Sequence, residues 1–301
     1  MIKIFRLKII LLTLILVLVQ VITGCSGNQD DTENPSDLSG FFNIIGSNTL
    51  TPLTAIWAEE FMLLHTNVNI AVSGPGSGAG IAALINSTTD ICQASRQIKQ
   101  REINLAEAKG VEPYEIQIAS DALSVIVNPD NPVSELTIAQ ISAIYTGAIT
   151  NWAELGGSDT PIVAIARDTN SGTHLFFKEQ VVQMKGLPTE DKKLEYGNKV
   201  LFLPSTEEGV SEVAKNANAI FYPGLGYVTD EIKTLAIKKT ADSMGVFPSI
   251  ETSLDGTYSI ARPLLYYTNG VPTGIPNAFI DYCLSDEGQA IVKGIGFVPL
   301  K

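Results

Sequence analysis

Basic residues, histidine and cysteine are all scarce in this chain. Its 301 residues include 20 Lys and Arg against 32 Asp and Glu, which gives a formal net charge of −12. A nucleic acid is excluded as a main partner, because phosphate backbones select clustered basic surfaces. Two histidines and three cysteines leave little material for a metal site, and neither C-x-x-C nor H-E-x-x-H occurs. We therefore expect no metal and no cofactor.

The usual catalytic motifs are also missing. Pro75 stands two residues before Ser77, where a G-x-S-x-G nucleophile elbow has glycine. No Gly-Lys-Ser/Thr follows the glycine-rich stretch, which excludes a Walker loop. A Ser–His pair would need His65 or His174, and no acidic residue at a telling spacing supports a triad. The sequence therefore predicts a protein that is not an enzyme.

The N-terminus has the pattern of an export signal. Lys3, Arg6 and Lys8 precede an apolar run over residues 9–19. This run is about half the roughly 20 residues of a membrane-spanning helix, and it fits a secretory h-region. The I-T-G-C that ends at Cys25 resembles the bacterial lipobox. We expect residues 1–24 to be a signal peptide and Cys25 to be lipidated. A plain signal peptide or a short N-terminal anchor is the alternative.

Residues 25–40 and the remaining cysteines suit an exported protein. The stretch S-G-N-Q-D-D-T-E-N-P-S-D-L-S-G is polar, acidic and free of aromatic residues, which is typical of a flexible tether. An oxidising compartment would permit a disulfide between Cys92 and Cys283. Their spacing alone does not pair them, and two buried free thiols are the simpler interpretation.

The rest of the chain predicts an α/β protein with two units. Hydrophobic residues make up 45% and charged residues 17%, as in globular proteins. Strand and helix patterns alternate with short loops, which favours mainly parallel sheets flanked by helices, with a ligand between the units. Strands are expected at residues 41–45, 68–72, 90–94, 122–127, 162–166, 225–228 and 234–237. Helices are expected at residues 52–65, 81–85, 101–109, 137–145, 171–184, 277–284 and 286–292.

Three helix starts share glycine and hydroxyl residues. They lie at residues 46–49, 76–78 and 170–173, and Arg167 stands just before the third. A helix start offers free N–H groups and partial positive charge, and glycine lets a ligand approach the backbone. Three such starts together would form an anion site built mostly from neutral donors. For any one of them, simple N-capping is the alternative.

Several motifs together resemble one known family. In order they are G-S-N-T-L-T-P-L, G-S-G-A-G, T-D-I-C-Q-A-S-R, V-N-P-D-N-P-V, Y-T-G-A-I-T-N-W, R-D-T-N-S-G-T-H, R-P-L-L-Y-Y-T and S-D-E-G-Q-A-I-V-K-G-I-G-F-V-P-L. This order is similar to the phosphate-binding proteins of bacterial and archaeal phosphate ABC importers, over residues 41–301. The resemblance implies a two-lobed type II periplasmic-binding-protein fold that encloses inorganic phosphate in a cleft between the lobes.

The family also implies an organisation and a role. Residues 41–124 and 230–301 would form the first lobe and residues 125–229 the second, with crossings near 120–127 and 226–229. The protein would be a monomeric, extracytoplasmic receptor, anchored to the membrane through its lipid, that delivers phosphate to an ABC permease and its ATPase. A phosphate- or oxyanion-sensing or surface-binding protein of the same fold is the alternative.

The resemblance also implies a set of ligand residues. Asp90 would accept a hydrogen bond from the proton that bound phosphate carries and so reject sulfate, which carries none, while Arg167 would compensate the charge. A loop contact for Asp90 and an ion pair with Asp168 for Arg167 are the alternatives. The departures are Asn48, where the family often has Ser or Thr, and His174. The implied phosphate-binding residues are Asn48, Thr49, Ser77, Asp90, Arg167, Ser171, Gly172 and Thr173.

Overall fold

Two five-stranded sheets organise the part of the chain that the computed structural model describes, residues 38–300. We call residues 38–122 and 261–300 the first lobe and residues 123–260 the second lobe, because each set holds one of these sheets. The predicted signal peptide, Cys25 and nearly all of the tether lie outside the described residues.

The sheet of the first lobe has the order β2-β1-β3-β12-β4. The pairs β1/β2 and β1/β3 are parallel, whereas β12 is antiparallel to both β3 and β4. Its strands are β1 (Ser39–Gly46), β2 (Asn67–Ser73), β3 (Ile91–Ala94), β4 (Pro113–Ala122) and β12 (Ala261–Asn269). Its helices are η2 (Asn48–Leu50), α2 (Thr51–Leu64), α3 (Ser77–Ile85), α4 (Gln100–Glu107), α9 (Gly274–Leu284) and α10 (Asp286–Gly294).

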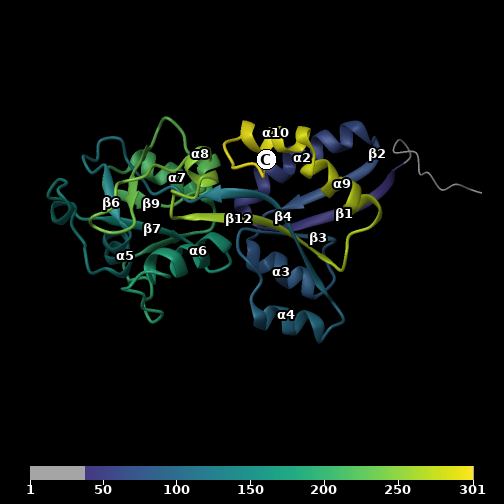
Figure 1. Cartoon of the computed structure of the whole chain (residues 1–301), viewed down its shortest axis with the longest axis horizontal. Helices are drawn as coiled ribbons and strands as arrows, with labels where there is room; N and C mark the ends of the chain where they lie inside the picture. The colour runs from purple at the N-terminus through teal and green to yellow at the C-terminus, as the bar shows by residue number, and fades with distance from the viewer. Residues whose placement is uncertain (1–37, 301) are drawn as a thin grey trace, which may run out of the picture. The chain divides into compact units, whose positions relative to one another are not determined.

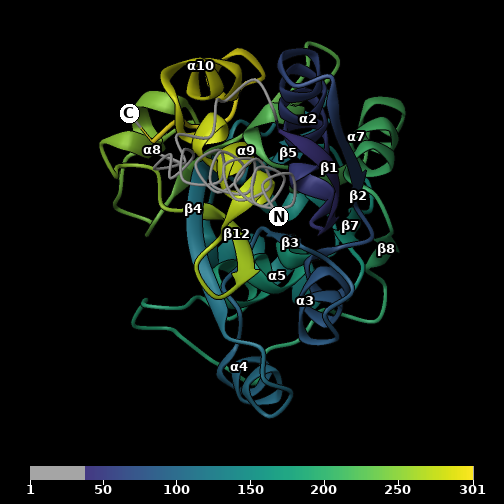
Figure 2. The ribbon, with the colours of Figure 1, turned by 90° about the vertical axis from the view of Figure 1, so that its right-hand side faces the viewer.

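Helices cover both faces of this sheet, as Figures 1 and 2 show. Helices α2, α9 and α10 pack on one face, and α3 and α4 pack on the other. Successive residues of a strand point to opposite faces, so a strand buried on both faces reads as a continuous apolar run. In β12, Leu264 and Tyr266 join the core under α2, whereas Leu265 and Tyr267 join the core under α3. A central strand therefore serves both cores.

The second lobe repeats the mixed pattern. Its sheet has the order β10-β5-β9-β7-β8, and β6 and β11 form a separate two-stranded sheet. Strand β7 is parallel to β8 and β9, whereas β5 is antiparallel to β9 and β10. The predicted mainly parallel sheets are thus mixed sheets. The strands are β5 (Ile126–Val127), β6 (Glu135–Thr137), β7 (Val163–Arg167), β8 (Leu201–Leu203), β9 (Ala219–Phe221), β10 (Lys233–Thr234) and β11 (Ala236–Lys238).

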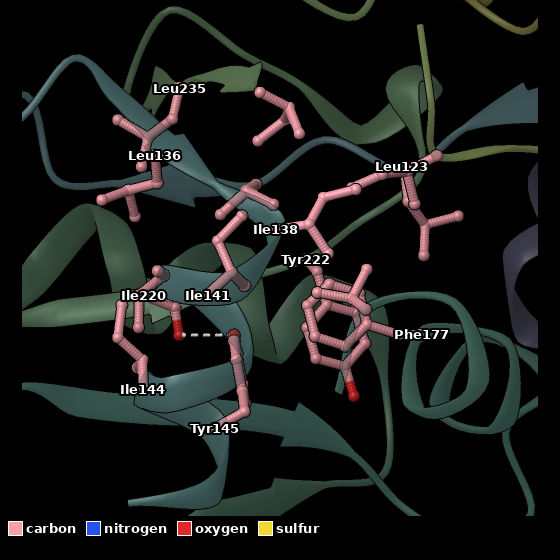
Figure 3. Close-up of a cluster of buried hydrophobic side chains, with 14 of the residues drawn as sticks. Leu123, Leu136, Ile138, Ile141, Ile144, Tyr145, Phe177, Ile220, Tyr222 and Leu235 are labelled. Atoms are coloured by element: carbon pink, nitrogen blue, oxygen red, sulfur yellow. Dashed lines mark hydrogen bonds between the residues drawn. The ribbon is translucent and has the colours of Figure 1, made fainter. Parts of the chain in front are cut away.

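Aromatic residues hold the core of the second lobe. The rings of Phe177 and Tyr222 stack with centroids 3.6 Å apart, and the Tyr145 hydroxyl donates to the carbonyl of Ile220 (Figure 3). A buried tyrosine hydroxyl needs such a partner, and burial raises the pKa of Tyr145. The surrounding helices are α5 (Ile138–Thr146), η3 (Trp152–Leu155), α6 (Gly172–Phe177), η4 (Lys178–Val182), α7 (Thr206–Lys215), η5 (Leu225–Tyr227) and α8 (Ile250–Leu254).

The chain passes between the lobes along two adjacent strands. Strand β4 leaves the first sheet at Ala122, and β12 returns beside it at Ala261, with these two residues paired (Figure 1). The first crossing lies where the sequence placed it. The second does not, because β10, β11 and Ile260 belong to the sheets and core of the second lobe. The second lobe therefore extends to residue 260 rather than 229.

The segment expected to carry that second crossing has another role. Residues 225–228 were expected to form a strand, but Leu225–Tyr227 forms the 3-10 helix η5. This helix contacts the first lobe: the Tyr227 hydroxyl donates to the carbonyls of Asn48 and Thr49, over 3.0 and 3.2 Å. A short apolar run does not distinguish a strand from a packed turn, which explains the difference.

Both cysteines of the described body are free and buried, in agreement with the simpler interpretation. Cys92 and Cys283 belong to different hydrophobic cores, and burial raises the pKa of each thiol. Between residues 38 and 300, none of the helices combines the length and the apolar character needed to span a membrane.

Candidate functional site

The predicted helix starts meet between the two lobes. Thr49 comes from η2 of the first lobe, and Thr173 lies at the start of α6 in the second lobe. Their hydroxyl oxygens are 2.9 Å apart, and both residues are buried. Residues 124 positions apart in sequence thus share one hydrogen bond. The contact brings the loops at 46–49 and 170–173 together.

Three serines of the first lobe extend this cluster. The Ser47 hydroxyl donates to Ser95 Oγ over 2.9 Å, and Ser77 Oγ lies 3.2 Å from the same atom. The Ser95 backbone N–H donates to Ser77 Oγ over 3.1 Å. All three serines are buried. Each hydroxyl both donates and accepts, so the group can offer its protons to an anion that lies among them.

The glycine-rich loops allow the lobes to approach at this point. A Cβ on Gly172 would lie 2.4 Å from Ser77 Oγ and 2.7 Å from Ser95 Oγ, which is closer than side chains pack. Gly76 has φ of +117°, and a Cβ there would meet the carbonyl oxygen of Asn170 at 2.6 Å. The backbone of each lobe therefore reaches the polar cluster of the other.

Helix α6 presents its N-terminal end to the same cluster. The Ser171 hydroxyl accepts from the N–H groups of Thr173 and His174, over 3.1 and 3.3 Å, and so caps the helix. Capping and anion binding are compatible, because a helix start carries several free N–H groups. Ser171, Gly172 and Thr173 are all buried at this end.

A buried ion pair borders the hydroxyl cluster. Asp121 Oδ2 accepts from Arg262 Nε and Nη2 over 3.1 and 2.8 Å, and neither side chain is exposed. Arg262 also donates to the carbonyl of Ser95 and, over 3.0 Å, to Thr173 Oγ1 of the other lobe. Burial lowers the pKa of Arg262, and Asp121 acts against that shift. The guanidinium remains charged, as arginine does in proteins.

Arg167 lies at the edge of the cluster and is also buried. Its Nη1 donates to Asn48 Oδ1 over 3.0 Å and to the Thr206 hydroxyl, and its Nη2 donates to the carbonyl of Pro204. Its Nε is buried without a hydrogen-bond partner. Burial lowers the pKa of Arg167, while Asp168 acts in the opposite direction. The alternative for Arg167, an ion pair with Asp168, does not occur among the salt bridges of the described residues.

Asp90 does not join the other predicted residues, and this assignment is corrected. It stands just before β3, whereas Ser95 follows the last residue of that strand. Asp90 is exposed and pairs with Asn43: its carboxylate accepts from the Asn43 N–H over 2.9 Å, and its own N–H donates to Asn43 Oδ1 over 3.0 Å. The alternative, a contact of Asp90 with a loop, is not what the structure shows either, because Asn43 belongs to strand β1.

The charges around the hydroxyl cluster favour an anion. Arg167 and Arg262 are buried there with Asp121 as the one buried carboxylate beside them, so the described site carries an excess of positive charge. A cavity of about 330 Å³ opens next to it, between Arg96–Lys99 of the first lobe and residues 175–185 of the second, with Arg262 in its wall. Within residues 38–300, no group of three or more His, Cys, Asp or Glu side chains is placed to hold a metal ion.

Comparison with known proteins agrees with this geometry. The sequence profile of the PBP superfamily domain matches residues 29–287. The phosphate-binding protein PstS of Pseudomonas aeruginosa is 32% identical over 285 residues, which cover 89% of this chain and 85% of that protein. This chain belongs to the PBP superfamily and to its phosphate-binding protein family.

Other members of the family are similar over most of their length. PstS of Staphylococcus epidermidis is 31% identical, with 91% of this chain and 83% of that protein covered. A Clostridium perfringens protein, assigned as a phosphate ABC transporter substrate-binding protein, has a crystal structure with bound phosphate. It is 33% identical, with a TM-score of 0.76 over 87% of this chain and all of that chain. The family membership and the two-lobed α/β fold are thus established.

Four residues of the site were missed by the sequence analysis. Ser47, Ser95, Asp121 and Arg262 complete the buried polar group, yet none was named as a candidate ligand residue. The signals were present: Ser95 lies in the T-D-I-C-Q-A-S-R motif, Arg262 opens R-P-L-L-Y-Y-T, and Asp121 interrupts an apolar stretch. A charged residue within such a stretch indicates a buried partner, which here lies 141 positions away.

Proposed function

We propose that this protein binds inorganic phosphate between its lobes and delivers it to an ABC permease. The observation that carries the proposal is the buried group of hydroxyls contributed by both lobes, with Arg262 beside Thr173. Neutral hydroxyls, helix-start N–H groups and a net positive charge together suit a small tetrahedral anion. The phosphate-binding relative from Pseudomonas aeruginosa and the phosphate in the Clostridium perfringens structure point to the same ligand.

The proposed site differs from the one inferred from sequence in two respects. Thr49, Ser77, Ser171, Gly172 and Thr173 remain as proposed donors to phosphate. Ser47, Ser95 and Arg262 are added to the group, and Asp90 is removed from it. Asn48 and Arg167 lie at its border, with Arg167 supplying charge. With Asp90 removed, a serine or threonine hydroxyl would accept the hydrogen bond from the proton of bound phosphate, since a hydroxyl accepts as well as donates.

Binding would act through closure of the lobes. Contacts such as Thr49–Thr173 and Arg262–Thr173 exist only when the lobes are together, so an anion that bonds both sides favours that state. The closed receptor would dock on the permease, whose partner ATPase drives uptake. We propose an extracytoplasmic monomer, lipid-anchored at Cys25 and without catalytic activity.

Titration calorimetry tests the proposal directly. The mature chain with Cys25→Ser would be unfolded, freed of bound anion and refolded, and phosphate and sulfate would be injected in parallel. We expect saturable one-to-one binding of phosphate. Absence of phosphate binding by a correctly refolded protein would overturn the proposed function. A phosphate-ester turnover assay on the same sample would detect any hydrolytic activity, which the proposal excludes.

A further inference from the structure

Asn48 makes an unusual set of contacts across the lobes. Its side-chain oxygen Oδ1 accepts three hydrogen bonds, and all three donors belong to the second lobe. Arg167 Nη1 and the Thr206 backbone N–H each donate over 3.0 Å, and the Thr206 hydroxyl donates over 3.1 Å. One carboxamide oxygen of the first lobe therefore serves a buried arginine and a helix start of the other lobe.

Asn48 supplies a hydrogen-bond acceptor to the first turn of helix α7, although the two belong to different lobes. Thr206 is the first residue of α7, and the N–H groups in the first turn of a helix have no partner within the helix. Ser205 accepts from the Glu208 N–H, which leaves the Thr206 N–H to Asn48. When the lobes separate, the helix start and Arg167 lose this acceptor together.

The remaining groups around Arg167 show why the loss matters. Its guanidinium is buried, its Nε has no partner, and the other acceptors of its Nη atoms come from Pro204 and Thr206 of its own lobe. Asn48 Oδ1 is thus the first-lobe acceptor for this charge among the described contacts. Leaving a buried charge with fewer hydrogen bonds is costly, so the contact stabilises the closed arrangement.

We propose that Asn48 is an interlobe latch, a positioning residue that sets the stability of the closed state through Arg167 and Thr206. The latch rests on the proposed function where it affects phosphate affinity. For a receptor that must be closed to hold its ligand, the apparent affinity falls in proportion to the closed population. Asn48 therefore tunes phosphate retention without itself having to contact the anion.

Variants of Thr206 distinguish the latch role of Asn48 from a direct contact of Asn48 with the ligand. Thr206→Val removes the hydroxyl that bonds both Asn48 and Arg167, whereas Thr206→Ser keeps it. A matched control is Thr54→Val, since Thr54 is equally buried but bonds Tyr266 within the first lobe. Phosphate affinity would be measured for Asn48→Ala, Thr206→Val, the double variant and the two controls.

We expect Asn48→Ala and Thr206→Val each to weaken phosphate binding by about tenfold or more, the effect of one hydrogen bond to a charged group. The losses in the double variant should be less than additive, because Asn48→Ala already removes the hydrogen bond between Asn48 and the Thr206 hydroxyl that Thr206→Val removes. Thr206→Ser and Thr54→Val should bind like the wild type. Unchanged affinity in both Asn48→Ala and Thr206→Val, or strictly additive losses, would overturn the latch.

A second measurement follows closure without ligand. Spin labels on Leu105→Cys in the first lobe and Met244→Cys in the second, both highly exposed sites, report the interlobe distance. Asn48→Ala should lengthen the mean distance in phosphate-free protein, and an unchanged distance distribution would overturn the latch. If the wild type fails to bind phosphate, the proposed function is contradicted. The latch is still tested in that case, because the label distances are measured without phosphate.

Discussion

Arg262 Nη2 and Thr173 Oγ1 lie 3.0 Å apart, although one residue belongs to the first lobe and the other to the second. The same guanidinium is held by Asp121, and both charged side chains are fully buried. The pair thus fixes the arginine at the point where the hydroxyls of the two lobes meet. The donors of a planar guanidinium point in fixed directions, so the two hydrogen bonds to Asp121 set the orientation of Arg262.

Asp121→Asn should destabilise the protein strongly. The change removes the negative charge and leaves Arg262 buried without compensation, which costs about 3–5 kcal/mol in buried pairs. Urea unfolding of wild type and variant measures the difference. Glu135→Gln provides a control, because the ion pair of Glu135 with Lys238 is partly exposed and should contribute less than about 1 kcal/mol. Equal stability losses in the two variants would contradict the role of the buried pair.

Gly172→Ala should weaken phosphate binding while the fold persists. The new Cβ would meet Ser77 Oγ at 2.4 Å and Ser95 Oγ at 2.7 Å, so the lobes would have to close less completely. Overpacking of this kind costs about 1–3 kcal/mol, or roughly tenfold to a hundredfold in affinity. Calorimetry measures it, with Gly294→Ala as the control, because a Cβ there meets nothing within 4 Å. Wild-type affinity in Gly172→Ala would place the anion elsewhere.

Asp90→Asn should leave the preference between phosphate and sulfate unchanged. Asp90 is exposed and bonds Asn43 at the far end of β3 from Ser95, so it does not face the proposed ligand. Parallel titrations of wild type and variant with both anions measure the ratio of affinities. If the ratio narrows in the variant, the carboxylate of Asp90 does reach the anion, and the assignment made from sequence would be restored.

Acid should destabilise the protein through His174. Its Nδ1–H donates to the carbonyl of Arg167 over 2.7 Å, and its ring packs against Tyr196 and Phe202. Burial is the main cause that lowers the pKa of His174 below the usual 6.5, and Lys178 lowers it further. The hydrogen bond to the Arg167 carbonyl and the charges of Asp168 and Glu195 act in the opposite direction. The unfolded chain therefore takes up a proton first as the pH falls. The stabilisation is complete above about pH 6.5 and declines below it.

Urea unfolding at pH 7.5 and pH 5.5 measures this effect. His174→Gln keeps a side-chain donor for the Arg167 carbonyl but does not titrate, so its stability should fall less between the two values than that of the wild type. Carboxylates titrate in both proteins, and the difference between them isolates the histidine. An identical pH dependence in wild type and variant would show that His174 contributes nothing to it.

Local features of the site were predictable from the sequence, and long-range ones were not. The three helix starts were found because glycine, hydroxyl residues and the following apolar period lie within a few positions of each other. The structure brings these starts together at Thr49, Ser77 and Thr173. Asp90 was wrongly assigned to the site. It stands at one end of the four-residue strand β3 and the site lies at the other end, and composition does not fix where a strand begins and ends.

The predicted end of the second lobe, at residue 229, was wrong for a related reason. Strands β10 and β11 have two and three residues, too few to show an alternating pattern, and they join the second lobe only through pairing with β5 and β6. Strand β12 was missed because it is buried on both faces, which removes the alternation. Arg262, the second residue of this strand, and its partner Asp121 were missed with it.

The position of β12 also has a consequence for the order of folding. The second lobe is one continuous segment, residues 123–260, whereas the first lobe needs β12 between β3 and β4. During vectorial synthesis or export from the N-terminus, the second lobe is complete before the central strand of the first lobe is available. Until then β3 and β4 have no common neighbour, and their edges are open to wrong pairing. We therefore expect the first lobe, although it contains the first strand of the described chain, to complete its sheet after the second lobe.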